Sequence, residues 1–564
     1  MNAKFNFSSF SVCLILFIFT LFFVSCGADQ QENDAPTSVD TSFASCDAEM
    51  FTLRDLNQDY DPKSAIFIEL NGDSATSSSS KVTIDGTTIK ITDDGIYIIS
   101  GTLDDGMIIV DAASDDKPQL VLNGVSIFSS ASAPIYIKEA NKVFITLAKG
   151  TQSTLRSGEE FISIDESNID STIFSRQDLT LNGQGSLTIN SPAGHGVVCK
   201  DDLVISSGTY KITSASHGID SNDSIRITSA SLDITAGKDG LHTENSDDST
   251  RGFFYISSGK ITISSNGDGI SSSYFSQIKN GDISITTSSS GADTDSFKGI
   301  KASGVVLVED GNIKISSADD AIHSNDSICI NGGNFDLSTG DDGMHADNTL
   351  SILSGNIDIT KSYEGLEALT ISISGGKINI VASDDGLNAA GGTDSSGFAG
   401  ATTKMPPPRP GEQFGGGAGS SASNGLIVIT GGTLNIKASG DGIDANGSIS
   451  ITGGNITVCG PTSGDTAVLD YDKTGTISGG TFIGTGAYMM AQSLEGDGQG
   501  VIGVQVGNQS AGTEITVADS KGNTIISYTP QLPFQIFIFS SPEIKKGESY
   551  TISVGTISGT INAS

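Results

Sequence analysis

Acidic residues beside glycine recur along this chain, and their spacing makes them the residues best placed to do chemistry. In four successive copies of one short pattern, the residue before a small residue is acidic: Asp320, Asp342, Glu364 and Asp385. A second acid precedes it in three of these copies: Asp319, Asp341 and Asp384. Hard oxygen ligands in number, at variable spacing, favour Ca²⁺. These turns therefore predict a cation-binding cluster if the fold brings them side by side.

A second set of polar residues stands two positions after the same small residue. The chain places there Asp220, His242, Ser271, Lys301, His323, His345, Glu367, Asn388 and Asp444. We expect the members nearest the acidic cluster to contact a ligand: His323, His345, Lys301, Glu367 and Asn388. The alternative is that the histidines are ordinary outward-facing polar residues on a strand face.

Stacking gives the acidic turns a physical cost. Two like charges about 4.8 Å apart repel by roughly 3–4 kcal/mol at an effective dielectric near 20. A stack of carboxylates must therefore take up protons, which raises the pKa values, or bind cations. The purely structural alternative is a turn in which Asp caps its own backbone and Gly adopts a positive φ.

A repeat of 21 or 22 residues decides the expected fold. Gly343 follows Ala321 by 22 residues, Gly365 follows Gly343 by 22, and Gly386 follows Gly365 by 21. Between these positions run short strands of alternating polarity separated by Gly turns. A β-propeller needs about 40 residues per blade, and the leucine-rich repeat signature is missing. We predict an all-β, right-handed, single-stranded parallel β-helix, a solenoid with coils of about 22 residues.

The strength of the repeat divides the chain. Residues 51–190 keep the strand rhythm without the acidic-Gly pattern and are predicted to be N-terminal coils. Residues 191–500 carry the pattern, with a projecting Gly/Pro-rich loop at 390–423, where prolines cannot join a hydrogen-bonded ladder. Residues 501–564 lose the repeat and are predicted to form a C-terminal β cap that protects the exposed end of the solenoid.

The N-terminus resembles a bacterial lipoprotein signal. Residues 1–25 combine Lys4 with an apolar run from Phe10 to Val24, shorter than the roughly 20 residues of a membrane span. Cys26 is the expected lipidation site, and 26–50 the expected flexible tether; the alternative is ordinary cleavage, with Cys26 incidental. We expect an exported protein, lipid-anchored to the bacterial cell membrane or outer membrane and facing the periplasm or cell surface. We expect no disulfide among Cys199, Cys329 and Cys459, because distant coils do not touch.

Charge limits the partners. The 564 residues include 66 Asp plus Glu against 30 Lys plus Arg, a formal net charge of −36. Such a surface repels nucleic acid and anionic lipid, so contact with a membrane is expected only through the N-terminal lipid. The charged fraction of 17% is too low for a disordered acidic chain. We expect a monomer.

Three features resemble a known family. One is Asp-Asp-Gly-Met-His-Ala-Asp at 341–347, with related turns at 319–325 and 384–389. Another is the pair of N-terminal segments at 94–103 and 120–127. The third is the Gly/Pro-rich insertion followed by Ser540-Ser541-Pro542. Over residues 60–560 the chain resembles the carbohydrate-binding domain-containing family of calcium-binding, pectate-lyase-like parallel β-helix proteins. Some members bind acidic polysaccharides such as polygalacturonate.

The resemblance implies Ca²⁺ held by turn carboxylates, with the metal meeting the carboxylates of a uronate polymer. The positions that match are Asp319, Asp320, Asp341, Asp342, Asp347, Glu364, Asp384 and Asp385. Two turns depart from the pattern: Ala321 replaces Gly in one, and Tyr363-Glu364 replaces Asp-Asp in another.

Three functions are compatible with these residues. The first is calcium-dependent, non-catalytic binding of an acidic polysaccharide. The second is a polysaccharide lyase, which needs a base to remove the proton α to the uronate carboxyl group and a cation to stabilise the developing charge. Lys301 is the candidate base; its alternative role is a counter-charge on an acidic face. The third is a structural surface rod or adhesin.

Overall fold

The computed structural model describes residues 50–289, 296–390, 424–464 and 466–564, and in this part of the chain β-strands dominate. The predicted signal peptide (1–25), Cys26 and nearly all of the tether and of the 390–423 loop lie outside the described residues. Within them, α2 (Leu53–Leu56) is the only helix, and no helix is long and apolar enough to cross a membrane. A single sheet links 47 of the described strands. The prediction of an all-β protein with a long, mainly parallel sheet is confirmed.

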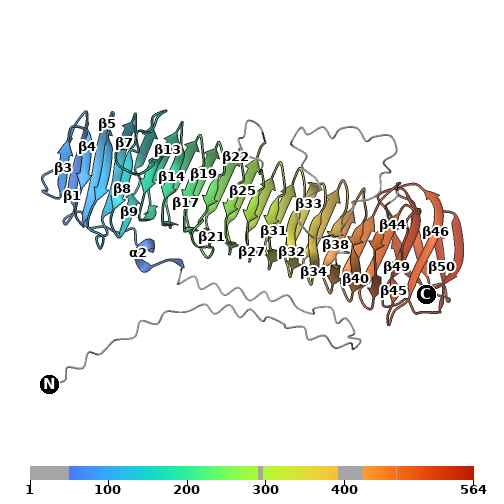
Figure 1. The fold of residues 1–564 in the computed structure, drawn as a ribbon. Coiled ribbons are helices and arrows are strands. Elements are labelled where there is room, and N and C mark those ends of the chain that lie inside the picture. Colours follow the sequence, from blue (N-terminus) through green and yellow to red (C-terminus); the bar gives the residue numbers. More distant parts are fainter. Residues whose placement is uncertain (1–49, 290–295, 391–423, 465) are drawn as a thin grey trace, which may run out of the picture. The chain divides into compact units, whose positions relative to one another are not determined.

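Each strand of the repeat pairs in parallel with the corresponding strand of the next repeat, which produces three ladders (Figure 1). We call them ladders A, B and C in their order along one repeat. Ladder A follows the acidic-Gly turn and contains β8 (Ile135–Glu139), β11 (Ser171–Ser175), β14 (His195–Cys199), β17 (Ile219–Ser221), β20 (Leu241–Thr243), β23 (Ile270–Ser272), β26 (Ile300–Ala302), β29 (Ile322–Ser324), the first parts of β32 (Met344–Ile352) and β34 (Leu366–Ile373), β36 (Leu387–Ala389), β39 (Ile443–Ala445) and β42 (Leu469–Tyr471).

The other two ladders complete each repeat. Ladder B contains β9 (Lys142–Leu147), β12 (Asp178–Gly183), β15 (Asp202–Ile205), β18 (Ser224–Ile227), β21 (Phe253–Ile256), β24 (Ser276–Ile278), β27 (Val306–Val308), β30 (Ser327–Ile330), the second parts of β32 and β34, β37 (Gly425–Ile429), β40 (Gly447–Ile451), β43 (Thr474–Ile477) and β45 (Glu495–Gly496). Ladder C contains β10 (Gln152–Ser157), β13 (Ser186–Ser191), β16 (Thr209–Ser214), β19 (Ser231–Ala236), β22 (Lys260–Ser265), β25 (Asp282–Thr287), β28 (Asn312–Ser316), β31 (Asn334–Ser338), β33 (Asn356–Ser362), β35 (Lys377–Ala382), β38 (Thr433–Lys437), β41 (Asn455–Cys459) and β44 (Thr481–Gly486).

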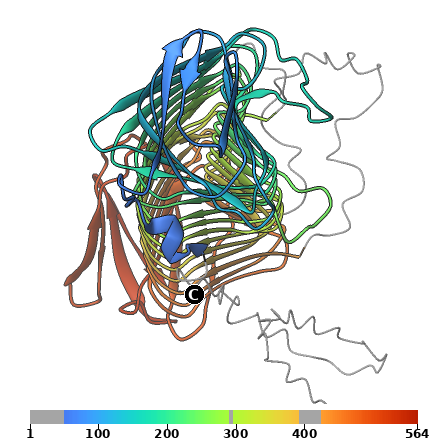
Figure 2. The same ribbon diagram turned by 90° about the vertical axis from the view of Figure 1, so that its left-hand side faces the viewer.

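The register of ladder A agrees with the spacing of the sequence repeat. Ile322 pairs with Met344, and Met344 pairs with Leu366, so that both steps are 22 residues. The later strands follow the path of the earlier ones in the view of Figure 2. Residues at equivalent positions of successive repeats therefore stand in columns, about 4.8 Å apart.

Side-chain alternation explains why these segments are strands. β19 and β22 of ladder C show a strict alternation of exposed or partly exposed and buried residues. The buried members are mostly Ile and Leu, and they form one continuous core along the three ladders. Their burial is the main stabilising term, because the short strands alone contribute little. Cys199, Cys329 and Cys459 are unpaired, as predicted.

The turn glycines are required for close packing and not for a left-handed backbone. Neither Gly343 nor Gly365 has a positive φ, so the purely structural alternative was wrong on this point for these turns. A Cβ on Gly365 would instead collide with the carbonyl oxygen of Gly386 in the next repeat and with Cγ2 of Ile380 in β35 of its own repeat. Stacking of the repeats, in which Leu366 N donates to Gly386 O at 3.2 Å, brings these backbones together.

An antiparallel pairing borders the ladders at one end, and a short helix packs against ladder B. At the C-terminal edge, β49 (Phe534–Ser540) pairs antiparallel with β44 and with β46 (Val501–Gln509). A separate four-stranded sheet contains β47 (Ile515–Ala518), β48 (Thr524–Tyr528), β50 (Ser549–Val554) and β51 (Ile557–Asn562). At the N-terminal side, α2 docks on ladder B. Its Asp55 is 1% exposed and lies 2.8 Å from Lys142 Nζ and 2.6 Å from Thr180 Oγ1.

We predict that Asp55→Ala destabilises the protein by about 3 kcal/mol, because it leaves Lys142 without its buried partner. Burial alone would raise the pKa of Asp55, but Lys142, Thr180 and Thr52 lower it. A lowered folded-state pKa means that this stabilisation is present near neutral pH and is lost as the pH falls through the acidic range. Chemical denaturation at several pH values tests this. Asp59→Ala, an exposed neighbour, is the control; equal effects of both substitutions would contradict the prediction.

Candidate functional site

The acid before the small residue, which we call the turn acid, uses one carboxylate oxygen to bind the next repeat. Asp320 Oδ1 accepts a hydrogen bond from Asp342 N at 3.1 Å, and Asp342 Oδ1 accepts one from Glu364 N at 3.1 Å. Asp239 and Asp268 repeat the arrangement at 2.7 and 2.8 Å. The turn acid therefore caps the backbone of the following repeat. The structural alternative had assumed that it caps its own. This contact leaves the second oxygen free to face other groups.

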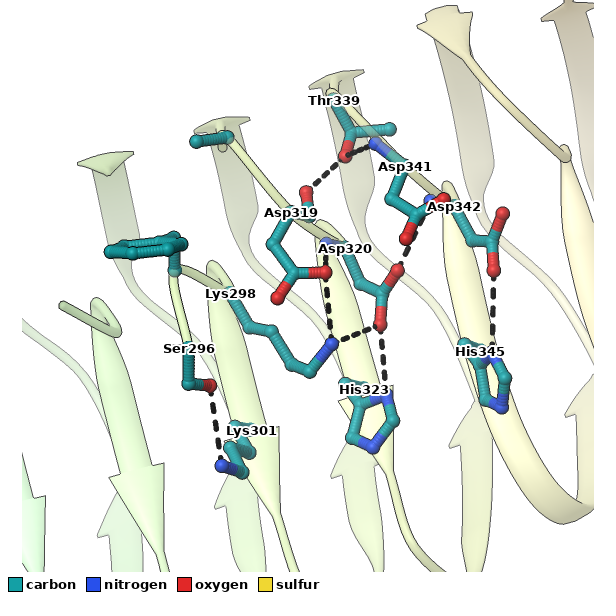
Figure 3. Close-up of polar contacts among 12 residues, drawn as sticks. Ser296, Lys298, Lys301, Asp319, Asp320, His323, Thr339, Asp341, Asp342 and His345 are labelled. Carbon is teal, nitrogen blue, oxygen red and sulfur yellow. Dashed lines mark hydrogen bonds and ion pairs between the residues drawn. The ribbon is translucent and has the colours of Figure 1, made fainter. Parts of the chain in front are cut away.

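Lys298 interrupts this column, and the neighbouring turn compensates (Figure 3). It occupies the turn-acid position but has no carboxylate, so the N–H of Asp320 is instead bound by Asp319 Oδ1 at 2.9 Å. Lys298 Nζ donates to Asp319 Oδ1 at 2.9 Å and to Asp320 Oδ2 at 2.7 Å. The ammonium thus neutralises two carboxylates that were predicted to be calcium ligands.

Two histidines meet the second oxygen of their own turn acid, three residues earlier (Figure 3). His323 Nδ1 lies 2.8 Å from Asp320 Oδ2, and His345 Nδ1 lies 3.2 Å from Asp342 Oδ2. His345 Nδ1 is also 2.9 Å from Glu367 Oε2 in the next repeat, and its Nε2 is 3.6 Å from Asp347 Oδ1. Each imidazole therefore acts as a partner of buried carboxylates.

Burial and neighbouring charges shift the pKa values of Asp342 and His345. Asp341 and Asp342 are fully buried, and His345 is 1% exposed. Burial alone would lower the pKa of His345, but Asp342 and Glu367 raise it to about 11. Burial raises the pKa of Asp342 well above its ordinary value, and the charges of Asp320 and Glu364 add to the effect. Burial leaves almost no surface of His345 for direct contact with a polymer.

One repeat further on, the cluster contains only oxygen donors. Asn388 Nδ2 donates to Glu364 Oε2 at 2.8 Å, while Asn388 Oδ1 is buried and has no hydrogen-bond partner among the described residues. Asp384 Oδ1 and Asp385 Oδ1 converge on Gly440, where any Cβ would collide with both oxygens. Asp384 and Asp385 are partly exposed. The charges of Asp384 and Asp385 also raise the pKa of Glu364, so these residues lie near one another. We call Glu364, Asp384, Asp385 and Asn388 the oxygen-only group.

The charges of this group are not balanced by imidazole or ammonium contacts in the described residues. Burial raises the pKa of Glu364 to about 9, helped by the charges of Glu367 and Asp385. Burial likewise raises the pKa of Asp385 to about 8, with contributions from Asp441 and Asp384. Carboxyl groups in this state bind either a proton or a cation.

The eight predicted metal ligands therefore fall into different environments. Asp319 and Asp320 share the Lys298 ammonium, while Asp342 and Asp347 face His345, so neither pair resembles an all-oxygen calcium site. One carboxylate oxygen of Asp341 lies within 4.8 Å of carboxylate oxygens of Asp319 and Asp320. Glu364, Asp384 and Asp385, joined by Asn388, match the oxygen donors that Ca²⁺ prefers.

Lys301, the candidate base, pairs with His323 in ladder A. Both residues stand two positions after the small residue of their turn, which we call the partner position. Lys301 Nζ donates to Ser296 Oγ at 3.2 Å (Figure 3). The same Nζ is 3.7 Å from Asp268 Oδ2. It is directed toward the preceding repeat and not toward the oxygen-only group. These contacts match the role of counter-charge, the alternative that the sequence left open.

Sequence reasoning missed two relationships. The first is the contact between Lys298 and both Asp319 and Asp320, which the lone basic residue in an acidic column could have signalled. The second is the pairing of a turn acid with a histidine three residues later, in Asp239–His242, Asp320–His323 and Asp342–His345. That spacing is visible in the sequence once the turn acid and the partner position are known to share one side of the turn.

A comparison with known families bears on this region. Residues 85–343 match the family model of carbohydrate-binding domain-containing proteins. The matched range contains Lys298, Asp319, Asp320 and Asp342, and it ends before Glu364. The oxygen-only group thus lies outside the matched range.

Two known proteins are similar to part of this chain. A carbohydrate-binding domain-containing protein of Acetivibrio thermocellus is 41% identical over 126 residues, which are 22% of this chain and 44% of that protein. The chain thus matches less than half the length of this relative. The solved structure of a polysaccharide lyase-like protein from C. thermocellum, a gadolinium derivative, aligns with 43% of this chain and 96% of its own at 34% identity, with a TM-score of 0.41.

We predict that Lys298→Met destabilises the protein by about 3–5 kcal/mol, because Asp319 and Asp320 then stand buried without their shared ammonium. Urea denaturation measures this. Lys314→Met removes the same charge from an exposed pair with Asp336, where side-chain exposures are 68% and 51%, and is expected to cost less than about 1 kcal/mol. A loss for Lys298→Met no larger than that of the control would show that the ammonium is not required.

We predict that, in the presence of a chelator, the contribution of Glu364 and Asp385 to thermal stability falls as the pH rises from about 4 to about 9 and changes little above that. The pKa values of Glu364, about 9, and Asp385, about 8, are raised in the folded protein. The folded state therefore binds more protons than the unfolded state, and raising the pH removes this stabilisation.

Glu364→Gln keeps the acceptor for Asn388 but removes the charge, so it should stabilise the protein by about 1–3 kcal/mol near pH 9. Differential scanning calorimetry over the pH range measures the effect. Glu548→Gln, at an exposed glutamate, should leave the profile unchanged. A Glu364→Gln profile as steep as that of the unmodified protein would contradict the assignment.

Proposed function

We propose that this protein is a non-catalytic binder of acidic, polygalacturonate-like polysaccharide, and that Ca²⁺ at the oxygen-only group mediates the binding. One observation carries the proposal: Glu364 and Asp385 keep carboxyl groups with raised pKa values beside the orphaned oxygen of Asn388. A divalent cation relieves the repulsion among these carboxylates and offers open coordination positions to the carboxylates of a ligand.

The residues that would hold the cation are Glu364, Asp384, Asp385 and Asn388. Asp384 and Asp385 are partly exposed, so a polymer can approach from their side. Glu367 and Asn388 stand in one column with His345 and Lys301. The family match supports a carbohydrate as ligand. A divalent cation held by these carboxylates would favour a carbohydrate that carries carboxylates of its own.

The proposal extends to the fold and to the location of the protein. We propose that the three ladders wind as a closed, right-handed parallel β-helix, supported by the pairing of every strand with its equivalent in the next repeat. We also propose that the protein is exported and anchored through a lipid on Cys26. Export would place an acidic-polysaccharide binder where such polymers occur.

Retention on a polygalacturonate affinity gel, with calcium or with chelator, tests the binding. We predict calcium-dependent retention that Asp384→Asn/Asp385→Asn weakens by at least about tenfold. Asp358→Asn, which removes a partly exposed carboxylate from ladder C, is the matched control and should bind normally. Equal retention of the double variant and the control would overturn the assignment of the site.

The same incubation distinguishes the other two functions. A rise in absorbance from unsaturated uronate products, abolished by Lys301→Ala, would show that the protein is a lyase and would refute the non-catalytic function. No retention, combined with stabilisation by calcium, would leave a structural rod and refute the ligand. The proposed function requires retention without a rise in absorbance.

A further inference from the structure

Two histidines and one aspartate gather at the N-terminal part of ladder A, away from the oxygen-only group. Asp239 is the turn acid before β20, and His242 lies three residues later in that strand. His217 occupies the turn-acid position of the preceding repeat. Asp239 Oδ2 lies 2.8 Å from His242 Nδ1 and 3.3 Å from His217 Nδ1. The three donor atoms all lie within 4.8 Å of one another.

The two imidazoles are held in place by neighbours. Their ring centroids are 4.4 Å apart, with an interplanar angle of 25°, and His195 continues the stack 5.1 Å from His217. Glu244 Oε2 lies 3.6 Å from the other nitrogen of His242, Nε2. An outer carboxylate on the second nitrogen is a common support of a metal-binding histidine. Stacking and this carboxylate limit the reorganisation that metal binding requires.

We propose that His217, Asp239 and His242 bind a divalent transition metal of the zinc type. Ligand atoms around a tetrahedral ion with bonds of about 2.0 Å stand roughly 3.3 Å apart, close to the separations of 2.8 and 3.3 Å found here. Two imidazole nitrogens and one carboxylate suit Zn²⁺, Co²⁺ or Ni²⁺, whereas Ca²⁺ prefers oxygen ligands. The site is therefore chemically different from the proposed calcium site.

Metal binding replaces two existing contacts. The Nδ1 atom of His217 accepts a hydrogen bond from Asp239 N at 3.2 Å, and this acceptor lone pair would turn to the metal. The metal would also displace the proton shared between His242 Nδ1 and Asp239 Oδ2. The side chains of His217, Asp239 and His242 are 16%, 12% and 19% exposed, which opens a path for the ion and a position for a water ligand.

A second group of the same donor types argues for the choice of this one. Asp320, His323 and His345 also bring two imidazoles and a carboxylate together. There, however, the Lys298 ammonium lies 2.7 Å from Asp320 Oδ2, and the side chains of Asp320 and His323 are 0% and 6% exposed. A metal cation at Asp320 would be repelled by this ammonium. The carboxylate of Asp239 is paired instead with imidazoles, which can lose a proton and bind the metal.

Zinc titration of the full-length protein, prepared without a polyhistidine tag and followed by calorimetry, tests the site. We expect one equivalent of Zn²⁺ to bind in the presence of excess Ca²⁺. His217→Gln/His242→Gln should weaken this binding by at least about 100-fold, while His323→Gln should leave it unchanged. Unaltered zinc binding by the double variant, or loss of zinc binding in His323→Gln, would overturn the assignment.

X-ray absorption of the zinc-loaded, unmodified protein gives a result that does not depend on how the variants fold. Two imidazole nitrogens in the first coordination shell, together with oxygen, are expected. A shell of oxygen atoms alone, or no bound zinc, would refute the site. Because the readout is metal binding, it is independent of the proposed polysaccharide function, and either proposal can fail without the other.

Discussion

In-register parallel stacking is the constraint on which the rest of this structure depends. Each repeat places its equivalent residue about 4.8 Å from the last, so any residue type that recurs becomes a column. A column of leucine or isoleucine gains from this arrangement, because neighbouring side chains bury one another. A column of carboxylates loses roughly 3–4 kcal/mol per unshielded neighbour at an effective dielectric near 20. The acidic turns can therefore persist only where each one is matched by a compensating group.

The compensation follows one plan with a variable second half. One oxygen of the turn acid accepts the backbone N–H of the next repeat, as in Asp239, Asp320 and Asp342. The other oxygen meets whatever the partner position or the neighbouring turn supplies. That group is imidazole at His242, His323 and His345, and ammonium where Lys298 replaces the acid. The backbone contact is thus structural, while the second oxygen carries the chemical variation.

The sequence was sufficient for the repeat and for the columns, because period-2 alternation and the 22-residue spacing together determine the register. It correctly paired His345 with Glu367 and His323 with Lys301 as neighbours in one column. It could not determine burial: a turn residue's spacing does not reveal that Asp342 and His345 are enclosed. The structural alternative of a positive φ also fails at the turn glycines, because the carbonyl oxygen that excludes a Cβ at Gly365 belongs to Gly386 in the next repeat, and no local pattern encodes this contact.

A single ladder can therefore present different cation chemistry along its length by changing only two positions per repeat. Histidine at the partner position adds nitrogen donors, as at His242, and favours metals of the zinc type. Lysine at the turn-acid position, as at Lys298, provides the positive charge within the protein and makes an external ion unnecessary. Asparagine at the partner position, as at Asn388, preserves an all-oxygen environment whose charge must be balanced from outside. The buried aliphatic core does not involve these choices, and where Lys298 replaces the turn acid, Asp319 supplies the backbone cap in its place. In the proposed sites, cation preference is consequently a local property of each turn.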